Sequence, residues 1–280
     1  MQEIKIDDRH ATSLVPEGHD WKLAWHDEFD GPVLDRSKWG FRRHFWGKRF
    51  ETFAGEEAIR FDGKSNIELH LIRQGDDFSA PLLQTGSLTW DIPKDSQGFW
   101  PFGRYEQPRF MHRYGYYECR CRLQRQPGWW TAFWLQAPGI GATSDPGASG
   151  VEVDIMESFQ PGEIISHALH WNGYGHDHRG MHSNGMARID HKRDIMRLNL
   201  DDYHYFGVHW ARDGYTFYVD GVQSGQKLTD AVSHTEQFIL LHGECKGYRV
   251  DGKPCEEVRT VVLPEAFVVD HVRVFDEVNV

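Results

Sequence analysis

Three carboxylate side chains, Glu152, Asp154 and Glu157, lie within six residues of one apolar stretch. The β-branched and apolar residues between them predict a strand, and the turn-rich residues 139–149 come directly before it. Because side chains alternate between the faces of a strand, Glu152 and Asp154 share one face, and Glu157 falls on the other. A β-bulge at Ile155–Met156 would add one residue and return Glu157 to the face of the other two.

Such a row of carboxylates suits one kind of chemistry. Neighbouring carboxylates raise one another's pKa, so the group needs stabilising neighbours or a function. Retaining glycoside hydrolysis uses an ionised nucleophile and a protonated acid about 5–5.5 Å apart. On the bulged strand Glu152 and Glu157 are that pair, and Asp154 between them keeps their pKa values apart. The alternative is a solvated acidic face on an edge strand.

A second polar group could hold a metal ion. His176, Asp177 and His178 are consecutive, and His182 follows them. Histidine and aspartate so close together could ligate zinc, which would indicate a metalloenzyme on a β-barrel. We favour the alternative, a polar loop beside a carbohydrate groove.

The four cysteines do not form a disulfide framework in a chain of 280 residues. Cys119 and Cys121 share one face of a predicted strand, which favours small core residues. Cys245 and Cys255 flank a polar loop and could pair in an oxidising compartment.

Composition excludes some partners. The formal net charge of −11 argues against nucleic acid or an anionic membrane as the main partner. No run of eighteen apolar residues exists that would span a membrane. Residues 1–18 are polar and lack the apolar segment of a secretion signal, so the localisation stays open: cytoplasmic if the chain is full length, secreted if a signal was removed.

Alternating apolar and polar residues predict many strands and almost no helix. The predicted strands include residues 66–72, 115–123, 128–135, 166–171, 215–222, 237–242 and 268–275. Neither an internal repeat nor a linker is present. We therefore expect a polar, loose N-terminal extension over residues 1–18 and a single all-β domain over residues 19–280, built as a sandwich of two antiparallel sheets in a β-jelly roll.

The run from Glu152 to Glu157 resembles the bulged catalytic signature of glycoside hydrolase family 16. Further stretches resemble this family in the right order along the chain: residues 25–31, 37–39, 114–123, 128–135, 204–210, 218–221 and 270–275. The resemblance is to the laminarinase and agarase branch. It implies a concanavalin-like β-jelly roll with an open concave cleft, and a monomeric enzyme that cleaves internal β-linkages of a polysaccharide with retention.

The resemblance also implies residue roles. Glu152 matches the nucleophile, Glu157 the general acid/base and Asp154 the residue that assists between them. Trp130 and Trp134 match positions where the family stacks sugars, although core packing is the alternative for both.

Other residues follow from the same resemblance or from position along the chain. His170 and Glu118 are expected to line the cleft, unless His170 is structural and Glu118 pairs with Arg120. No cofactor is required. A structural calcium ion, which family members often carry, would lie near Glu28 and Asp270.

We expect a β-1,3- or mixed-linkage β-glucan as the substrate. Residues 239–248 differ from the Asn-rich strand of glucan-cleaving relatives, and a group of arginines could recognise sulfate or carboxylate. Those arginines are Arg104, Arg109, Arg113, Arg120, Arg122 and Arg125. A β-galactan of the agar, porphyran, carrageenan or host O-glycan type is therefore one alternative, and a non-catalytic lectin-like protein is another. The sequence does not separate a hydrolase from a transglycosylase.

Overall fold

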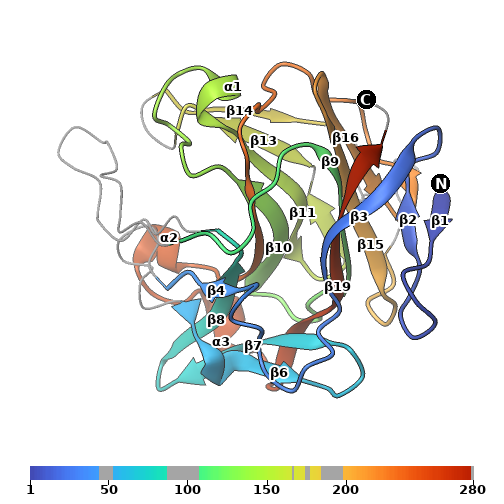
Figure 1. The fold of residues 1–280 in the computed structure, drawn as a ribbon. Coiled ribbons are helices and arrows are strands. Elements are labelled where there is room, and N and C mark those ends of the chain that lie inside the picture. The colour runs from blue at the N-terminus through green and yellow to red at the C-terminus, as the bar shows by residue number, and fades with distance from the viewer. Residues whose placement is uncertain (44–52, 87–106, 166, 174–176, 184–197, 279–280) are drawn as a thin grey trace, which may run out of the picture.

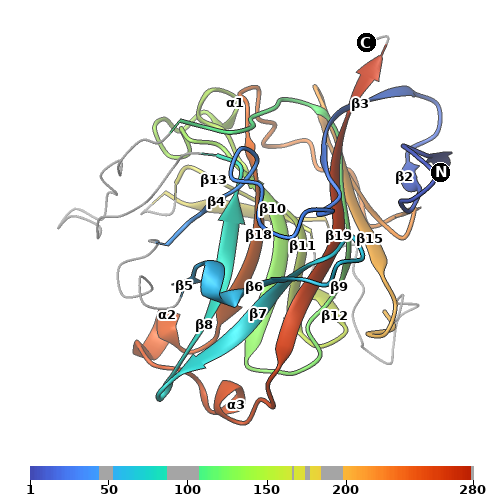
Figure 2. The same cartoon turned by 60° about the horizontal axis from the view of Figure 1, so that its bottom comes forward.

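The computed structural model describes residues 1–280 except 44–52, 87–106, 166, 174–176, 184–197 and 279–280 (Figure 1). Two antiparallel sheets face each other in the described chain (Figures 1 and 2). We name them the inner sheet, which carries the three carboxylates, and the outer sheet. The predicted sandwich of two antiparallel sheets is therefore confirmed.

The inner sheet contains eight of the strands. Its members are β4 (Gly40–Phe41), β8 (Asp77–Gln84), β18 (Phe238–Cys245), β10 (Trp129–Gln136), β11 (Glu152–Gln160), β12 (Glu163–Ile165), β13 (Ala168–Trp171) and β14 (Arg179–His182). Strand β10 pairs with β18 on one side and with β11 on the other, and β13 pairs with both β11 and β14. The carboxylates therefore lie on a strand with a neighbour on each side.

The outer sheet is organised around its longest strand. Its members are β3 (Asp20–Asp27), β6 (Ile59–Phe61), β7 (Ile67–Gln74), β9 (Gly115–Arg122), β15 (His204–Ala211), β16 (Gly214–Val219), β17 (Val222–Gln223) and β19 (Glu265–Val278). Strand β19 pairs with β7, β9 and β3. A hairpin from β7 to β8 connects the two sheets.

The remaining elements are short. They are β1 (Gln2–Ile4), β2 (Ser13–Val15), β5 (Phe53–Ala54), which runs parallel to β8, and the helices η2 (Glu56–Ala58), α1 (Pro146–Ser149), α2 (Tyr248–Asp251) and α3 (Glu256–Arg259). In the described part of the chain, no helix has the length and apolar character needed to cross a membrane.

The core lies between the two sheets and follows the period-two alternation of the strands. Phe133 and Leu135 of β10 and Val153 of β11 contribute to it from the inner sheet, while Cys119 and Cys121 of β9 contribute from the outer sheet. The prediction that these two cysteines are core residues is therefore confirmed. Cys245 and Cys255, for which a disulfide was considered, are free thiols.

The N-terminal residues are not the loose head that we expected. Strands β1 and β2 form an antiparallel hairpin, and Val15 packs with Tyr116 and Phe275 on the outer sheet, on the side away from the core. The Leu14 amide donates to the Glu118 carboxylate at 2.8 Å. Residues 1–18 thus cover part of the outer sheet, while their separation from a domain over residues 19–280 stays a prediction.

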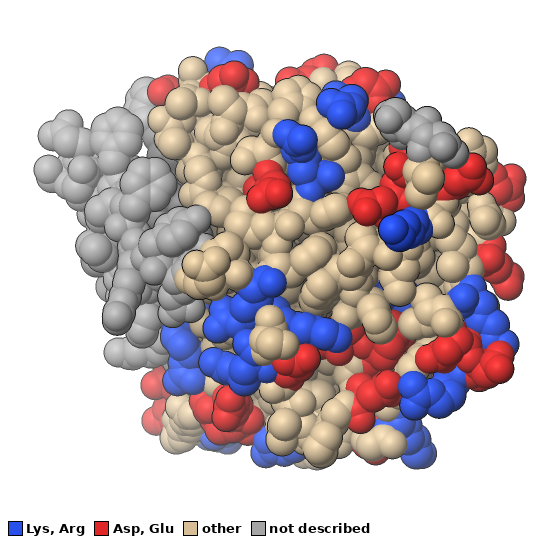
Figure 3. All heavy atoms as spheres, in the orientation of Figure 1, with Lys and Arg blue, Asp and Glu red and all other residues tan. Residues whose placement is uncertain are grey.

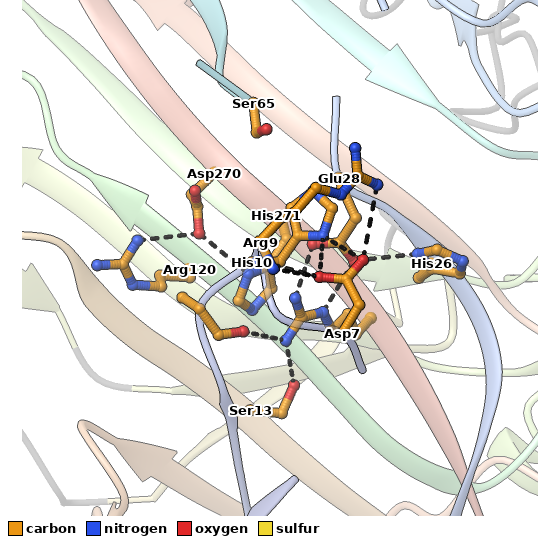
Figure 4. Close-up of polar contacts among 12 residues, drawn as sticks. Asp7, Arg9, His10, Ser13, His26, Glu28, Ser65, Arg120, Asp270 and His271 are labelled. Atoms are coloured by element: carbon orange, nitrogen blue, oxygen red, sulfur yellow. Dashed lines mark hydrogen bonds and ion pairs between the residues drawn. The ribbon is translucent and has the colours of Figure 1, made fainter. Parts of the chain in front are cut away.

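A buried ion pair ties this hairpin to β19 and β3. Arg273 has no exposed surface, and its Nε and Nη2 donate to the two oxygens of Glu28 at 2.9 and 2.7 Å. Its Nη1 donates to the Ala11 carbonyl and the Ser13 hydroxyl, both at 2.8 Å. Figure 4 shows His10 of the N-terminal segment close to Glu28, and Ser13 lower in the view. Burial alone would raise the pKa of Glu28, but hydrogen bonds from His26 and Arg273 lower it to about 2.

We predict that Arg273→Met destabilises the protein by about 3–5 kcal/mol, because it leaves the Glu28 carboxylate buried without its cation. Urea unfolding at neutral pH measures this difference. The matched control is Arg9→Met, which removes an arginine whose side chain is 73% exposed and which lies 3.6 Å from Asp30. The urea concentration at which half of the Arg9→Met protein is unfolded should stay close to the wild-type value. An equal loss of unfolding free energy in the two variants would contradict the prediction.

Candidate active site

The three carboxylates reach one face because β11 contains a bulge. Ala132 and Phe133 of β10 pair with Glu157 and Met156, and the register then shifts so that Trp134 pairs with Asp154. Ile155 has no opposite residue, which is the bulge expected at Ile155–Met156. We call the side of the inner sheet with Glu152, Asp154 and Glu157 the acidic face.

Packing explains why the bulge is stable. Ile155 and Met156 are consecutive, yet both are fully buried in the core between the sheets. A regular strand would turn one of them toward the acidic face. The extra residue therefore keeps two apolar side chains in the core and two carboxylates, Asp154 and Glu157, on the opposite side.

Strand β13 adds a histidine to the acidic face. His170 lies directly opposite Glu152, and Asp154 lies opposite Ala168. The His170 Nε2 is 3.4 Å from the Asp154 Oδ2. His170 thus lies next to the carboxylates, and its role in substrate binding stays a prediction.

The site contains more acidic groups than it can ionise at once. Burial and the charges of Glu152 and Glu244 raise the pKa of Glu157 to about 8. Burial and the charges of Glu157 and Glu152 raise the pKa of Asp154 well above its usual range. Burial, His178 and His182 lower the pKa of His170 to about 4. At neutral pH, Glu157 can therefore donate a proton, and His170 is neutral.

Trp130 and Trp134 project from β10 on the same side of the sheet. Each of the two residues is only 4% exposed. Phe159 stacks on Trp130 with ring centroids 5.3 Å apart, and the Arg249 guanidinium carbon lies 4.9 Å from the centroid of the same ring. Trp134 packs in an apolar cluster with Leu240. Sugar stacking on these rings stays a prediction, and at Trp130 it would require the neighbouring side chains to move.

Sequence reasoning missed an acidic residue on β18. Glu244 pairs with Trp130 in the sheet and is fully buried. Both of its oxygens accept from Arg249, at 3.0 and 3.2 Å, and its Oε2 is 3.1 Å from the His242 Nε2. The available signal was a single glutamate in the mostly apolar strand from Phe238 to Cys245. Its charge helps to raise the pKa of Glu157.

Comparison with known proteins identifies the family. The family model described as "Glycosyl hydrolases family 16" matches residues 49–238. The chain belongs to glycoside hydrolase family 16. The acidic stretch of β11 lies within the matched residues, and the chain is a glycoside hydrolase by this membership.

Known glycan-cleaving enzymes are similar to most of this chain. "Glucan endo-1,3-beta-glucosidase A1" of Niallia circulans is 27% identical over 95% of this chain, which spans 39% of that relative's length. "Beta-glucanase" of Rhodothermus marinus is also 27% identical, over 91% of this chain and 85% of the relative. "Beta-porphyranase B" of Zobellia galactanivorans is 25% identical over 79% of this chain and 73% of the relative.

A solved structure supports the fold. The laminarinase of Flavobacterium sp. UMI-01 matches with a TM-score of 0.63 and 17% identity, covering 91% of this chain and all of that one. The likeness shows that the sandwich has the same fold as this laminarinase, and the predicted β-jelly roll is confirmed.

One expected cleft residue of this family 16 chain is elsewhere. Glu118 lies on β9 in the outer sheet, has no exposed surface and accepts from the Leu14 amide. Its Oε1 lies 3.0 Å from the His271 Nε2. The prediction that Glu118 lines the cleft is therefore wrong, because the N-terminal hairpin covers this side of the outer sheet.

The two residues expected near a calcium ion already contact cationic side chains. Glu28 pairs with Arg273 through both oxygens, and the Asp270 Oδ2 accepts from Arg120 at 2.9 Å. In Figure 4, Arg120 and His271 both point toward Asp270. These carboxylates do not fit a calcium site without displacement of two guanidinium groups, so calcium stays a prediction with no support from this donor set.

The arginines considered for anion recognition are dispersed. Arg120 and Arg122 belong to the outer sheet, Arg125 pairs with Asp201, and Arg113 donates to the His234 carbonyl. Arg109 binds the Arg36 carbonyl, whereas Arg104 lies outside the described residues. On the face drawn in Figure 3, Lys and Arg side chains gather toward the lower left, and acidic side chains lie below them and to their right. The five arginines that the structure describes therefore give no argument for an anionic substrate.

We predict that the stability of the protein falls between about pH 5 and about pH 8 through Glu157. In this window the folded state keeps a proton on Glu157 that the unfolded state has released, because its pKa rises from 4.5 to about 8 on folding. The free energy of unfolding should therefore fall by up to about 1.4 kcal/mol per pH unit from this group. Urea unfolding at several pH values should show a shallower fall for Glu157→Gln than for the wild type.

The control for this titration is Glu256→Gln, which changes an exposed glutamate in α3. Its stability should follow the wild-type pH dependence. If the Glu157→Gln curve also followed it, Glu157 would ionise alike in the folded and unfolded states.

Proposed function

We propose that this protein is a retaining endo-glycoside hydrolase with Glu152 as the nucleophile and Glu157 as the general acid/base. The observation that carries the proposal is the bulge, which leaves two glutamates and Asp154 on one face of one strand. Membership of family 16 supports the same chemistry. The raised pKa of Glu157 supports its assignment as the protonated partner.

The reaction runs in two displacements. Glu152 attacks the anomeric carbon while Glu157 gives its proton to the glycosidic oxygen, so that the leaving sugar departs as an alcohol. Glu157, now ionised, then removes a proton from water, which attacks the anomeric carbon and releases Glu152. Asp154 lies between the two glutamates and, when protonated, donates a hydrogen bond to Glu152 and so limits its basicity.

The substrate proposed first is a β-1,3- or mixed-linkage β-glucan. Two relatives that cover at least nine tenths of this chain bear the names of a glucan endo-1,3-beta-glucosidase and a beta-glucanase. We propose that the enzyme acts as a monomer and binds the polysaccharide along the acidic face, beside Trp130, Trp134 and His170.

A β-galactan is the second candidate. The porphyranase relative supports it, and so does the composition of β18, where His242 and Glu244 face the same side as the carboxylates. A lectin-like role would explain the aromatic side chains, but it gives no use for a protonated and an ionised glutamate on one face.

We predict that Glu152→Gln and Glu157→Gln each lower kcat by at least about 10²–10⁴. A glutamine has nearly the shape of glutamate but can neither form the glycosyl ester nor transfer the proton. The assay uses a panel of β-glucans, agar, porphyran, carrageenan and mucin-type glycans, with sizing of the products and NMR of the anomer released first.

Two features make this test decisive. Glu157→Gln should recover its first step on an aryl glycoside with a good leaving group, which needs no acid, whereas Glu152→Gln should not. Glu256→Gln is the control and should keep wild-type turnover. Wild-type rates in Glu152→Gln, or an inverted first product, would overturn the proposal.

A further inference from the structure

The acidic face contains the donor set of a divalent metal site. Glu152, Asp154 and His170 each offer one ligand atom, and these atoms all lie within 4.8 Å of one another. The Asp154 Oδ2 and the His170 Nε2 are 3.4 Å apart. Two ligands of a tetrahedral ion, each at about 2.0–2.1 Å from it, are separated by about this distance.

The surroundings of His170 independently indicate a metal ligand. Its other ring nitrogen, Nδ1, lies 3.0 Å from the His178 Nε2. A histidine that binds a metal almost always donates its second ring N–H to an acceptor, usually a carboxylate, a backbone carbonyl or water, which fixes the ring and its tautomer. The His178 imidazole can take the place of that acceptor here. Here the bond to His178 leaves Nε2 directed at the carboxylates.

The backbone makes room for this orientation. Gly180 of β14 lies opposite His170, and a Cβ at Gly180 would be only 2.9 Å from the His170 Nδ1. The glycine therefore lets the imidazole lie against β14 and reach His178. Any larger residue would push the ring away from its present position.

We propose that Glu152, Asp154 and His170 bind one Zn²⁺ ion reversibly, with His178 positioning His170, and that the bound ion switches the enzyme off. One imidazole and two carboxylates suit zinc and similar transition metals, whereas calcium and magnesium prefer oxygen ligands alone. The positive charge also relieves the repulsion among the carboxylates of the acidic face.

Inhibition follows from the identity of the ligands and rests on the proposed function. A zinc ion bound to Glu152 withdraws electron density from its carboxylate and occupies the space in front of it, so that the carboxylate is a weaker nucleophile and cannot approach the anomeric carbon. The ion and the sugar therefore compete for one place, and zinc should act as a competitive inhibitor that a chelator reverses. Binding of the ion itself does not depend on any hydrolytic activity.

Cobalt(II) titration of the purified, chelator-treated protein at pH 7 tests the site, because a bound cobalt ion gives a visible absorption band that zinc then removes. We expect one equivalent to bind to the wild type. His170→Gln should abolish the band, and His178→Phe and Gly180→Ala should each weaken binding by about 10–100-fold. The control is His112→Gln, which removes a histidine that lies 2.8 Å from Asp276 outside this site, and it should bind cobalt as the wild type does.

The results separate the two proposals. Cobalt binding that needs His170, in a protein that hydrolyses no glycan, would keep the metal site and overturn the proposed function. Hydrolysis that depends on Glu152, without cobalt binding or with equal binding in His170→Gln, would overturn the metal site and keep the function. Unchanged affinity in both His178→Phe and Gly180→Ala would remove the positioning role of His178.

Discussion

One residue of extra length in β11 determines what the acidic face can do. Without the bulge at Ile155, Glu157 would enter the core and Met156 would face away from it. The extra residue, Ile155, thus lets two consecutive apolar side chains enter the core. It also keeps both glutamates on the other side of the strand. Stability and chemistry depend here on a single irregular register, so neither can change without the other.

The short distances among these carboxylates determine the protonation and the charge pairing at the acidic face. Glu152, Asp154 and Glu157 cannot all carry charge, which keeps protons on part of the group at neutral pH. Glu244 adds a further negative charge from β18, but Arg249 pairs with both of its oxygens. Protonation of some carboxyl groups and the pairing of Glu244 with Arg249 therefore both reduce the negative charge of the acidic face.

The sequence predicted those features that depend on neighbours along the chain. Alternation and the position of the bulge followed from the residue types of a single strand, and so did the core position of Cys119 and Cys121. Contacts between distant segments could not be predicted in this way. The strand pattern around Glu118 gives no sign of its burial, which depends on distant residues, Leu14 of the N-terminal hairpin and His271 of β19. The pairing of Glu244 with Trp130 likewise depends on strand order, which one sequence does not specify.

The length of β19 has a consequence for the order of assembly. This strand, over Glu265–Val278, supplies ladder partners for β7, β9 and β3, which come much earlier in the chain. The outer sheet therefore cannot close during synthesis until residues near 278 have left the ribosome. Contacts that distant in sequence also slow folding. Until β19 is available, the nascent chain keeps the apolar sides of its early strands uncovered. A chaperone has the longest opportunity to bind the chain at that stage.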